Sequence, residues 1–505
     1  MSTLIPTEEL HEITATSNND SAGAADDTDI RHVTPYDKHY VNVWLWEPNL
    51  RTGHVLTEDG VTQIAYHQYH AGKNTYLDNF LNPLWQALTE RLPMTMAPNL
   101  VTTLGGCHCI VSYIITWIVT AQNGPTAPPP VWLLLLNGYC IAVYYTLDCM
   151  DGKQARRTQS SSPLGQLFDH GIDCICLLGH LSSVQTWLQM TSVRAASASG
   201  SPNVYYYFLM QTTLQTSFFV AQWEEYYTSV LPHATGQVGV TEVNYGLAFV
   251  SLLNAGLLWM QQTTSDETTE WTSIYSTKVW PYLPATLKDG WLHQSRVRDV
   301  LLEPTLGMSL EDLQLRHVLS CGWYVMVSTL VVLSITRVTK YILRKRRAVR
   351  QQNPTKEKPK YIVYGTPSVL GAFSKLISPL LASVSIFCLP RSLLLKEQQL
   401  LSLCLGLVYI LITIKIIVFS MARQAYAAIQ VDVLVPWCVV LLWILKDPRW
   451  SGQGIHLLLQ VTAVWYLYRL YQWTTVAIHQ ICQRLNIQLF RIKNPAVEEN
   501  KTKTA

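Results

Sequence analysis

Charge is scarce in this chain of 505 residues: Asp, Glu, Lys and Arg together make up 14%, whereas hydrophobic residues make up 49%. A composition with so little charge argues against a single soluble domain and predicts a membrane protein. Zinc-type C-x2-C pairs are also lacking, because the eleven cysteines lie mostly inside apolar runs. We therefore expect buried, reduced thiols and no disulfide framework.

The beginning of the chain lacks a basic stretch followed by an apolar core. No cleavable signal peptide is expected, so the first spanning helix must direct the chain into the membrane. Residues 1–35 are rich in Ser, Thr, Asn, Asp and Ala, which predicts a disordered N-terminal tail.

Residues 36–96 are expected to form a cytosolic or interfacial segment. Within it, residues 77–92 carry apolar side chains near helical spacing, which predicts an amphipathic helix lying in the membrane interface. A helix packed on the protein itself is the alternative.

The remaining chain is dominated by apolar runs, and it shows no fixed repeat period. Runs of about 20 residues predict an all-α polytopic membrane protein with about ten transmembrane helices plus the N-terminal interfacial amphipathic helix. The runs lie near residues 100–121, 131–149, 165–190, 203–222, 243–261, 316–338, 366–389, 397–421, 431–446 and 455–478. The expected organisation is a core at 97–261, a lumenal loop at 262–315, C-terminal transmembrane helices at 316–480 and a cytosolic tail at 481–505.

Basic residues set the expected orientation. Between Arg337 and Lys360 there are ten Lys and Arg residues against one acid, Glu357, which places this segment in the cytosol. Counting through the predicted spans then puts both termini, and the loop that contains Arg156, on the cytosolic side.

The last five residues suggest a compartment. Lys501 and Lys503 lie fifth and third from the end, a pattern that resembles the dilysine retrieval signal of endoplasmic-reticulum membrane proteins. We expect a multi-pass protein of the endoplasmic-reticulum membrane, with the Golgi as the alternative.

Four aspartates fall in two pairs at the edges of apolar runs. Asp148 and Asp151 are spaced i,i+3, and Asp169 and Asp173 are spaced i,i+4, so each pair shares one face of a helix. Two helices joined by a short turn could bring all four carboxylates to one point. Such a cluster repels itself unless a cation lies within it, and one or two Mg²⁺ or Mn²⁺ ions suit oxygen ligands. A pair of acidic helix caps is the alternative.

These aspartates belong to a longer pattern, D-x2-D-G-x2-A-R-x8-G-x3-D-x3-D. It resembles the signature of the CDP-alcohol phosphotransferase family at every fixed position, which helix caps would not require. The matching residues are Asp148, Asp151, Gly152, Ala155, Arg156, Gly165, Asp169 and Asp173. The string D-G-K-Q-A-R-R-T-Q-S-S-S-P-L-G-Q-L-F-D-H-G is similar to the eukaryotic choline/ethanolamine phosphotransferase branch. Weaker similarity extends from about Asn99 to Ile492, but residues 262–315 resemble nothing we can place.

The resemblance implies an enzyme of the choline/ethanolamine phosphotransferase class whose catalytic core is residues 97–261. It would transfer phosphocholine or phosphoethanolamine from CDP-choline or CDP-ethanolamine to diacylglycerol, giving phosphatidylcholine or phosphatidylethanolamine and CMP. Expected partners are these nucleotides, acyl- or ether-linked diacylglycerol, membrane lipids and a second copy in a homodimer, and no nucleic acid is expected.

The resemblance also implies roles for single residues. The metal ligands are Asp148, Asp151, Asp169 and Asp173. Gly152, Ala155 and Gly165 leave space for the nucleotide and for close helix approach, and Arg156 binds a phosphate. Lys153 is a second phosphate candidate or merely solvated, and Asn99 contacts the substrate or caps a helix. The segment Trp223–Thr228 resembles the same branch and contacts the head group or nucleotide, unless it is an interfacial Trp with exposed acids.

A base must accept the proton of the attacking hydroxyl. His170 titrates near neutral pH and Asp173 is its rival, and we favour His170 because an aspartate that holds a metal is a poor base. Two other functions remain as alternatives. One is another CDP-alcohol phosphotransferase, such as one that uses CDP-diacylglycerol; the other is a cation-coupled transporter, although its acids would usually lie at the membrane midplane within repeats.

Overall fold

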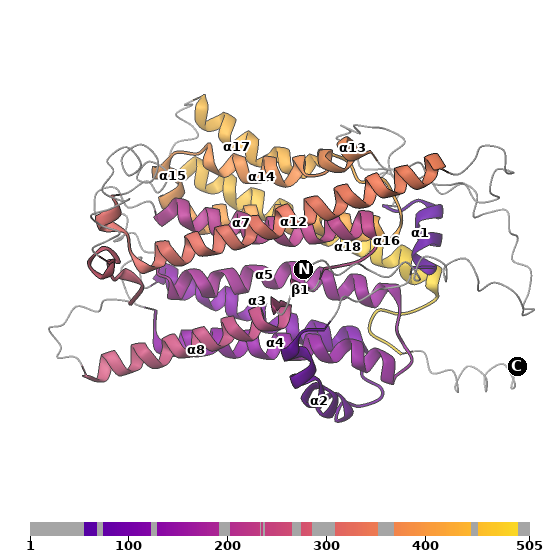
Figure 1. The fold of residues 1–505 in the computed structure, drawn as a ribbon, viewed down its shortest axis with the longest axis horizontal. Coiled ribbons are helices and arrows are strands. Elements are labelled where there is room, and N and C mark those ends of the chain that lie inside the picture. The colour runs from indigo at the N-terminus through magenta and orange to yellow at the C-terminus, as the bar shows by residue number, and fades with distance from the viewer. Residues whose placement is uncertain are drawn as a thin grey trace, which may run out of the picture.

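The computed structural model describes residues 55–67, 74–122, 129–190, 203–232, 234–235, 238–264, 274–284, 309–351, 368–445 and 453–492. Long helices lie side by side in it (Figure 1). They are α3 (Pro98–Gln122), α4 (Val131–Arg157), α5 (Pro163–Trp187), α7 (Asn203–Thr228), α8 (Val240–Thr264), α12 (Leu315–Gln351), α16 (Gln398–Met421) and α18 (Gln453–Leu485). The predicted N-terminal tail and the terminal lysines lie outside the described residues.

Shorter elements complete the described chain. The helices are α1 (Glu58–Ala65), α2 (Tyr76–Glu90), α13 (Val369–Ser374), α14 (Ile377–Phe387), α15 (Arg391–Lys396) and α17 (Leu434–Ile444). Single 3-10 turns occur at Ile274–Ser276, Trp280–Tyr282, Leu310–Asp312 and Val431–Val433. The strands β1 (Ala234–Thr235) and β2 (Val238–Gly239) form one small antiparallel pair before α8.

The prediction of an all-α polytopic membrane protein is confirmed, because helices occupy all ten predicted ranges. Among the described residues, six stretches are long and apolar enough to cross a membrane, and they correspond to α3, α4, α8, α12, α13 with α14, and α16. Helices α5, α7 and α18 are as long but less apolar, since they carry polar side chains that are buried inside the bundle, such as Gln211 and His180. Two predicted spans differ in detail: 366–389 is broken between α13 and α14, and α17 has only 11 residues.

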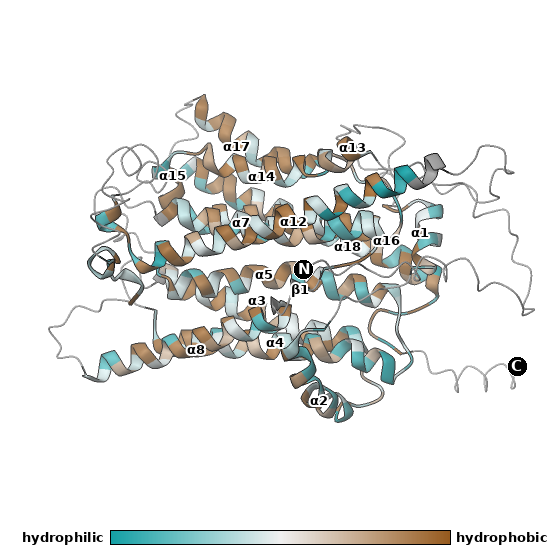
Figure 2. Ribbon diagram, in the orientation of Figure 1, coloured by the Kyte–Doolittle hydropathy of each residue, from teal (hydrophilic) through white to brown (hydrophobic). Residues whose placement is uncertain are grey.

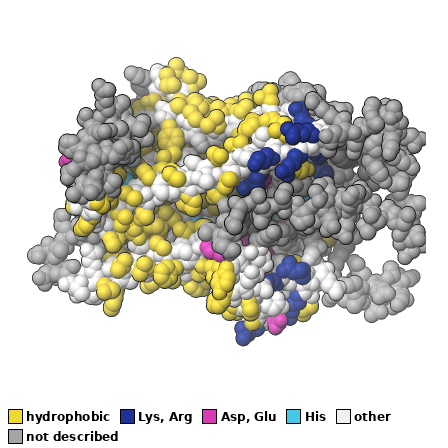
Figure 3. All heavy atoms as spheres, in the orientation of Figure 1, with side chains coloured by type: hydrophobic (Ala, Val, Ile, Leu, Met, Phe, Trp, Pro, Cys, Tyr) yellow, Lys and Arg dark blue, Asp and Glu magenta, His cyan; other side chains and the backbone are white. Residues whose placement is uncertain are grey.

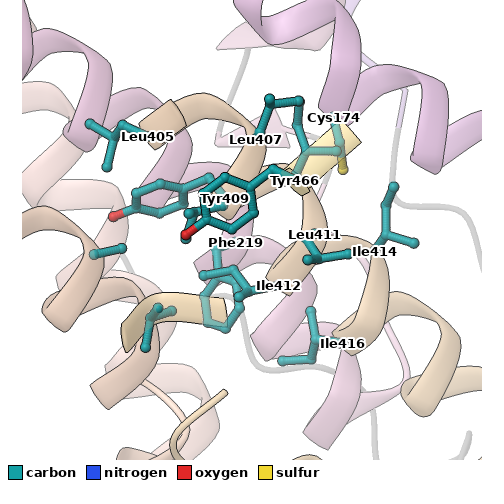
Figure 4. Packing of buried hydrophobic residues seen from close by; sticks show 14 of the residues in the cluster. Cys174, Phe219, Leu405, Leu407, Tyr409, Leu411, Ile412, Ile414, Ile416 and Tyr466 are labelled. Atoms are coloured by element: carbon teal, nitrogen blue, oxygen red, sulfur yellow. The ribbon is translucent and has the colours of Figure 1, made fainter. Parts of the chain in front are cut away.

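Helix α16 forms the centre of the bundle, because 94% of the residues in its apolar 18-residue stretch are buried. Its side chains pack against Cys174 of α5, Phe219 of α7 and Tyr466 of α18 (Figure 4). A helix that is apolar on all sides lies either in lipid or in the core of a protein, and the burial of α16 places it in the core. Helix α16 therefore holds the C-terminal helices against α5 and α7.

Helix α5 connects this C-terminal group to a second group formed by α3, α4 and α8, since it contacts α3 as well as α16. The approach of α5 to α3 depends on Gly179. A Cβ atom at this position would lie 2.8 Å from the carbonyl oxygen of Cys109, which is too close. Glycine thus allows the two backbones to approach each other closely at this point.

The predicted amphipathic helix is present as α2, which docks on α4 and α8. Trp85 is 4% exposed and donates a hydrogen bond to the Tyr245 hydroxyl at 3.1 Å. The Arg157 guanidinium donates to the Leu92, Thr89 and Glu90 carbonyls and so caps the end of the helix. The alternative expectation, that this helix packs on the protein itself, therefore holds for the face of α2 that carries Trp85.

The opposite face of α2 leaves Phe80 70% and Tyr76 77% exposed. Its position in the membrane interface stays a prediction that these exposed apolar side chains favour.

The two ends of the described chain meet beside α16. The Gln480 side chain on α18 accepts hydrogen bonds from the Val55 and Leu56 amides at 2.9 and 3.1 Å and donates to the Leu56 carbonyl at 3.0 Å. These bonds hold the segment before α1 against α18, so residues more than 400 positions apart in the sequence share one end of the bundle.

Basic residues gather toward this same end. On the face shown in Figure 3, the Lys and Arg side chains lie mainly toward the end where α1 and α2 are found, and hydrophobic side chains cover much of the rest. The basic segment after Arg337, expected as a loop, continues α12 as helix to Gln351, and Figure 2 shows this part as hydrophilic. The asymmetry agrees with the predicted cytosolic placement of this end.

A buried ionic cluster stabilises the C-terminal helices. Asp432 is fully buried and accepts a hydrogen bond from the Lys415 ammonium, and Arg469 Nε lies 3.5 Å from its other oxygen. Three elements, α16, the turn before α17, and α18, are joined in this way.

We predict that Asp432→Ala lowers the free energy of unfolding by about 3–5 kcal/mol, because it leaves buried cations without their carboxylate. Asp312→Ala is the matched control, since its ion pair with Lys278 leaves both side chains more than half exposed, and it should change stability by less than about 1 kcal/mol. Thermal unfolding of the detergent-solubilised protein measures both. Equal midpoints for the two variants would contradict the stabilising role of the cluster.

Candidate active site

The site forms where α4 ends and α5 begins. Arg157 ends α4, and a turn of five residues leads to α5, whose first turn is capped by Ser162 accepting a hydrogen bond from the Gly165 amide at 3.2 Å. Pro163 occupies the first helical position, where a missing N–H has no cost. The short turn brings the two predicted pairs of aspartates together.

Three of the four aspartates converge closely. One carboxylate oxygen from each of Asp148, Asp169 and Asp173 lies within 4.8 Å of the others. Asp148 Oδ1 and Asp169 Oδ1 are buried and have no hydrogen-bond partner among the described residues. Buried carboxylate oxygens without donors, aimed into one cluster, fit a hard divalent cation.

The remaining carboxylate oxygens are held by neighbouring helices. Asp151, which is 7% exposed, accepts a short hydrogen bond from the Thr102 hydroxyl on α3, and Asp173 accepts one from the Tyr144 hydroxyl on α4. The sequence reasoning missed Thr102 and Tyr144. Helical spacing could have indicated both, because Thr102 lies three residues after Asn99 and Tyr144 four residues before Asp148.

A polar cavity of about 510 Å³ opens beside the cluster, and eight of the predicted site residues line it. They are Asn99, Asp151, Gly152, Ala155, Arg156, Gly165, Asp169 and His170. Asp148, Asp173 and Lys153 are not among its lining residues. We call this space the polar pocket.

The small residues of the motif leave room in the polar pocket. A Cβ atom at Gly165 would lie 3.7 Å from Asn99 Oδ1, and one at Gly152 would lie 3.6 Å from the Arg156 side chain. Both are ordinary contact distances, so close helix packing does not by itself require these glycines. Their place in the lining explains them better, because a side chain there would fill the space of a ligand.

Lys153 lies apart from the polar pocket. Its ammonium donates to the Asn82 side chain on α2 and lies 5.9 Å from the centre of the Trp85 ring. These contacts join α4 to α2, and the phosphate role of Lys153 stays a prediction that its position does not favour.

His170 is 5% exposed and lines the polar pocket, whereas its rival Asp173 is engaged by Tyr144. Three other residues close to His170 on α5 face a different space. Phe168, Gly171 and Ile172 line an apolar cavity of about 280 Å³ between α5, α16 and α18. We call this second space the apolar groove.

The segment Trp223–Thr228 serves mainly to pack α7. Trp223 donates to the Ala372 carbonyl at 2.9 Å, and Glu224 forms an ion pair with Arg337 of α12. Glu225 alone reaches toward the site, where it accepts a hydrogen bond at 3.3 Å from Gln166 of the pocket lining.

Segments near both ends of the described part of the chain also reach the polar pocket, which the sequence did not predict. His67, just after α1, lines it and its Nε2 lies 3.0 Å from Gln166 Oε1. Residues 487–489, 491 and 492, just after α18, line it as well. No local pattern signals these contacts, because each depends on packing between distant segments.

Comparison with known proteins identifies the region that contains the motif. Residues 95–266 match the family model described as CDP-alcohol phosphatidyltransferase, close to the predicted core at 97–261. The chain is 31% identical over 201 residues to choline/ethanolaminephosphotransferase 2 of Arabidopsis thaliana, which covers 39% of this chain and 48% of the relative. It is 33% identical over 202 residues to cholinephosphotransferase 1 of Gallus gallus, covering 40% and 56%.

A third relative, cholinephosphotransferase 1 of Homo sapiens, is 34% identical over 202 residues, covering 40% of this chain and 46% of the relative. The chain thus spans about half the length of the curated relatives it matches. The cluster of aspartates, the capped turn between α4 and α5, and most of the polar pocket fall inside the matched region. Residues 95–266 of this chain, which contain the motif, therefore resemble the CDP-alcohol phosphatidyltransferase family.

Proposed function

We propose that this protein transfers phosphocholine or phosphoethanolamine from CDP-choline or CDP-ethanolamine to diacylglycerol, giving phosphatidylcholine or phosphatidylethanolamine and CMP. One observation carries the proposal: the polar pocket and the apolar groove both border α5, the helix that carries Asp169 and Asp173. Gln166, Asp169 and His170 line the first, while Phe168 and Gly171 line the second. A water-soluble donor and a lipid acceptor need such a meeting place.

The residues of the polar pocket suit a nucleotide diphosphate donor. Arg156, which lines the pocket, binds phosphate oxygens. Asp148, Asp169 and Asp173, with Asp151, hold one or two Mg²⁺ or Mn²⁺ ions. When bound, such ions neutralise charge that develops on the pyrophosphate. The space left by Gly152, Ala155 and Gly165 admits the nucleotide.

His170 acts as the base. Its position in the polar pocket, one residue from groove-lining Gly171, supports this assignment over Asp173, which Tyr144 already engages. The diacylglycerol hydroxyl oxygen forms a bond to the β-phosphorus while its proton moves to His170. The bond from that phosphorus to the bridging oxygen breaks, and CMP leaves with the electron pair.

The expected location is the endoplasmic-reticulum membrane, with the Golgi as the alternative, and with the site and both termini in the cytosol. The basic end of α12 and the turn between α4 and α5, which carries the site, lie toward the same end of the bundle (Figure 1), and this supports a cytosolic site. The homodimer and the choice between acyl- and ether-linked acceptors stay predictions.

Head-group transfer in lipid-reconstituted protein tests the reaction directly. Labelled CDP-choline and CDP-ethanolamine are each offered with diacylglycerol, with Mg²⁺, with Mn²⁺ and with chelator. We expect metal-dependent product that falls by about 100-fold or more in Asp151→Asn, because metal-ligand charge supplies several kcal/mol at the transition state. Asp312→Asn, on the exposed pair with Lys278, should keep full activity. No product from either donor with folded protein would overturn the proposal.

A substitution at His170 tests its role as the base separately from metal binding. We expect His170→Ala to lower kcat by about 10²- to 10⁴-fold, as for loss of a general base, while leaving metal-induced thermal stabilisation intact. Asp173→Asn should weaken that stabilisation as well. Turnover in His170→Ala comparable to the wild type would instead assign the proton to Asp173 or to water.

Because the clustered aspartates repel one another, neutralising one of them should change thermal stability in opposite directions with and without metal. In chelator, Asp148→Asn should raise the thermal midpoint, because one of several mutually repelling buried carboxylates becomes neutral. In saturating Mg²⁺ or Mn²⁺ the wild type should gain about 2.7 kcal/mol at 100-fold excess over Kd, and the variant should lose most of this gain. Equal metal responses in the two proteins would argue against Asp148 as a ligand.

A further inference from the structure

The polar pocket contains a second arginine that lies far outside the family domain. Arg491 and Arg156 both line it, although 335 positions separate them in the sequence. The segment that carries Arg491, Ile487–Ile492, is short and follows the last helix. Hydrogen bonds and an aromatic contact hold this segment in one conformation.

The end of α18 turns the chain back toward the pocket. Asn486 has φ of 52°, a left-handed conformation that asparagine tolerates better than most residues. The Ile487 amide donates to the Cys482 carbonyl at 3.1 Å, and the Asn486 amide donates to the Gln483 carbonyl at 3.3 Å. This pair of bonds is a Schellman motif, which ends a helix and reverses the chain in a defined direction.

A tight turn then presents Arg491. Gln488 and Arg491 form an antiparallel bridge, which places Leu489 and Phe490 at the tip of the turn. The Leu489 carbonyl accepts a hydrogen bond at 2.9 Å from Asn99 Nδ2 of α3. The Phe490 ring packs edge-on against Phe168 of α5, with 5.9 Å between ring centres. The turn is thus fixed to α3 and α5, two of the helices that border the polar pocket.

Helix α18 itself is also anchored near its end, because the Gln480 side chain accepts hydrogen bonds from the backbone amides of Val55 and Leu56. The start of the described chain, which delivers His67 to the pocket, and its end are therefore held together as one structure.

The positive charge of Arg491 suits a ligand that carries phosphate groups. A nucleotide diphosphate brings two phosphate groups, and Lys153, the second cation expected from the motif, is engaged with Asn82 instead. Arg491 is exposed to solvent and lines the pocket, and none of the ion pairs among the described residues includes it, so its guanidinium is available to a ligand. A guanidinium binds two phosphate oxygens at once, which suits a pyrophosphate.

We propose that Arg491 binds the phosphate groups of the nucleotide donor together with Arg156, on a turn positioned by Asn99 and Phe168. This inference rests on the proposed function in that the ligand is taken to be a cytidine diphosphate compound. It assigns part of the donor site to the C-terminal end of the chain, outside residues 95–266.

Binding of cytidine, CMP and CDP to the purified full-length protein tests the proposal without turnover. In Arg491→Ala, CDP should bind about 10- to 100-fold more weakly, because a hydrogen-bonded charge pair is lost, while cytidine binding stays unchanged. Arg491→Lys should recover part of the loss, since a point charge remains. In the transfer assay the KM for the CDP-alcohol should rise and the KM for diacylglycerol should not.

Arg484→Ala is the matched control, because Arg484 is an exposed arginine in the last turn of α18 that does not line the pocket. It removes the same charge and should leave CDP binding unchanged. Unchanged CDP binding in Arg491→Ala would overturn the proposal, and so would an equal loss for cytidine and CDP, which would mean that the turn only closes the pocket. CDP binding that depends on Arg491 without any head-group transfer would support this inference and sink the proposed function. Failure of the wild type to bind CDP would overturn both.

Discussion

The repulsion among clustered aspartates is the constraint on which this structure depends. Carboxylates at the edge of a membrane are costly, and here they are brought together by the short turn between α4 and α5. The surrounding helices reduce the cost in a specific way: Thr102 and Tyr144 each donate a hydrogen bond to one aspartate, while oxygens of Asp148 and Asp169 are left without donors. A cation fits these oxygens, and close packing such as that of Gly179 against α3 keeps the helices that supply them in place.

Helical periodicity explains how one element borders both the polar pocket and the apolar groove. Along α5, positions 165, 166, 169 and 170 face the polar pocket, whereas 164, 167, 168, 171, 172 and 175 face the apolar groove. Successive residues on a helix point about 100° apart, so neighbouring side chains can reach different environments. A residue such as His170 therefore lies one position away from the boundary between water-soluble and lipid-like surroundings.

The helices beyond the family domain contribute more than support. Buried α16 and the Lys415–Asp432–Arg469 cluster fix α18, and the end of α18 then directs Arg491 into the polar pocket. On the other side, Gln480 holds the segment that delivers His67. The apolar groove likewise needs α16 and α18 as walls. The domain at 95–266 thus supplies the aspartates, and the rest of the chain completes the spaces around them.

The sequence by itself determined the all-α class, the ranges of the long helices and the pairing of aspartates on helix faces, because all of these follow from local periodicity. It also located eight of the residues that line the polar pocket, seven of them within a motif confined to 26 positions. Only the tertiary structure decided that Lys153 joins α2, that Trp223 packs against α13, and that His67 and Arg491 enter the pocket. These contacts join segments far apart in the chain, and no local pattern specifies which distant side chain will fill a given space.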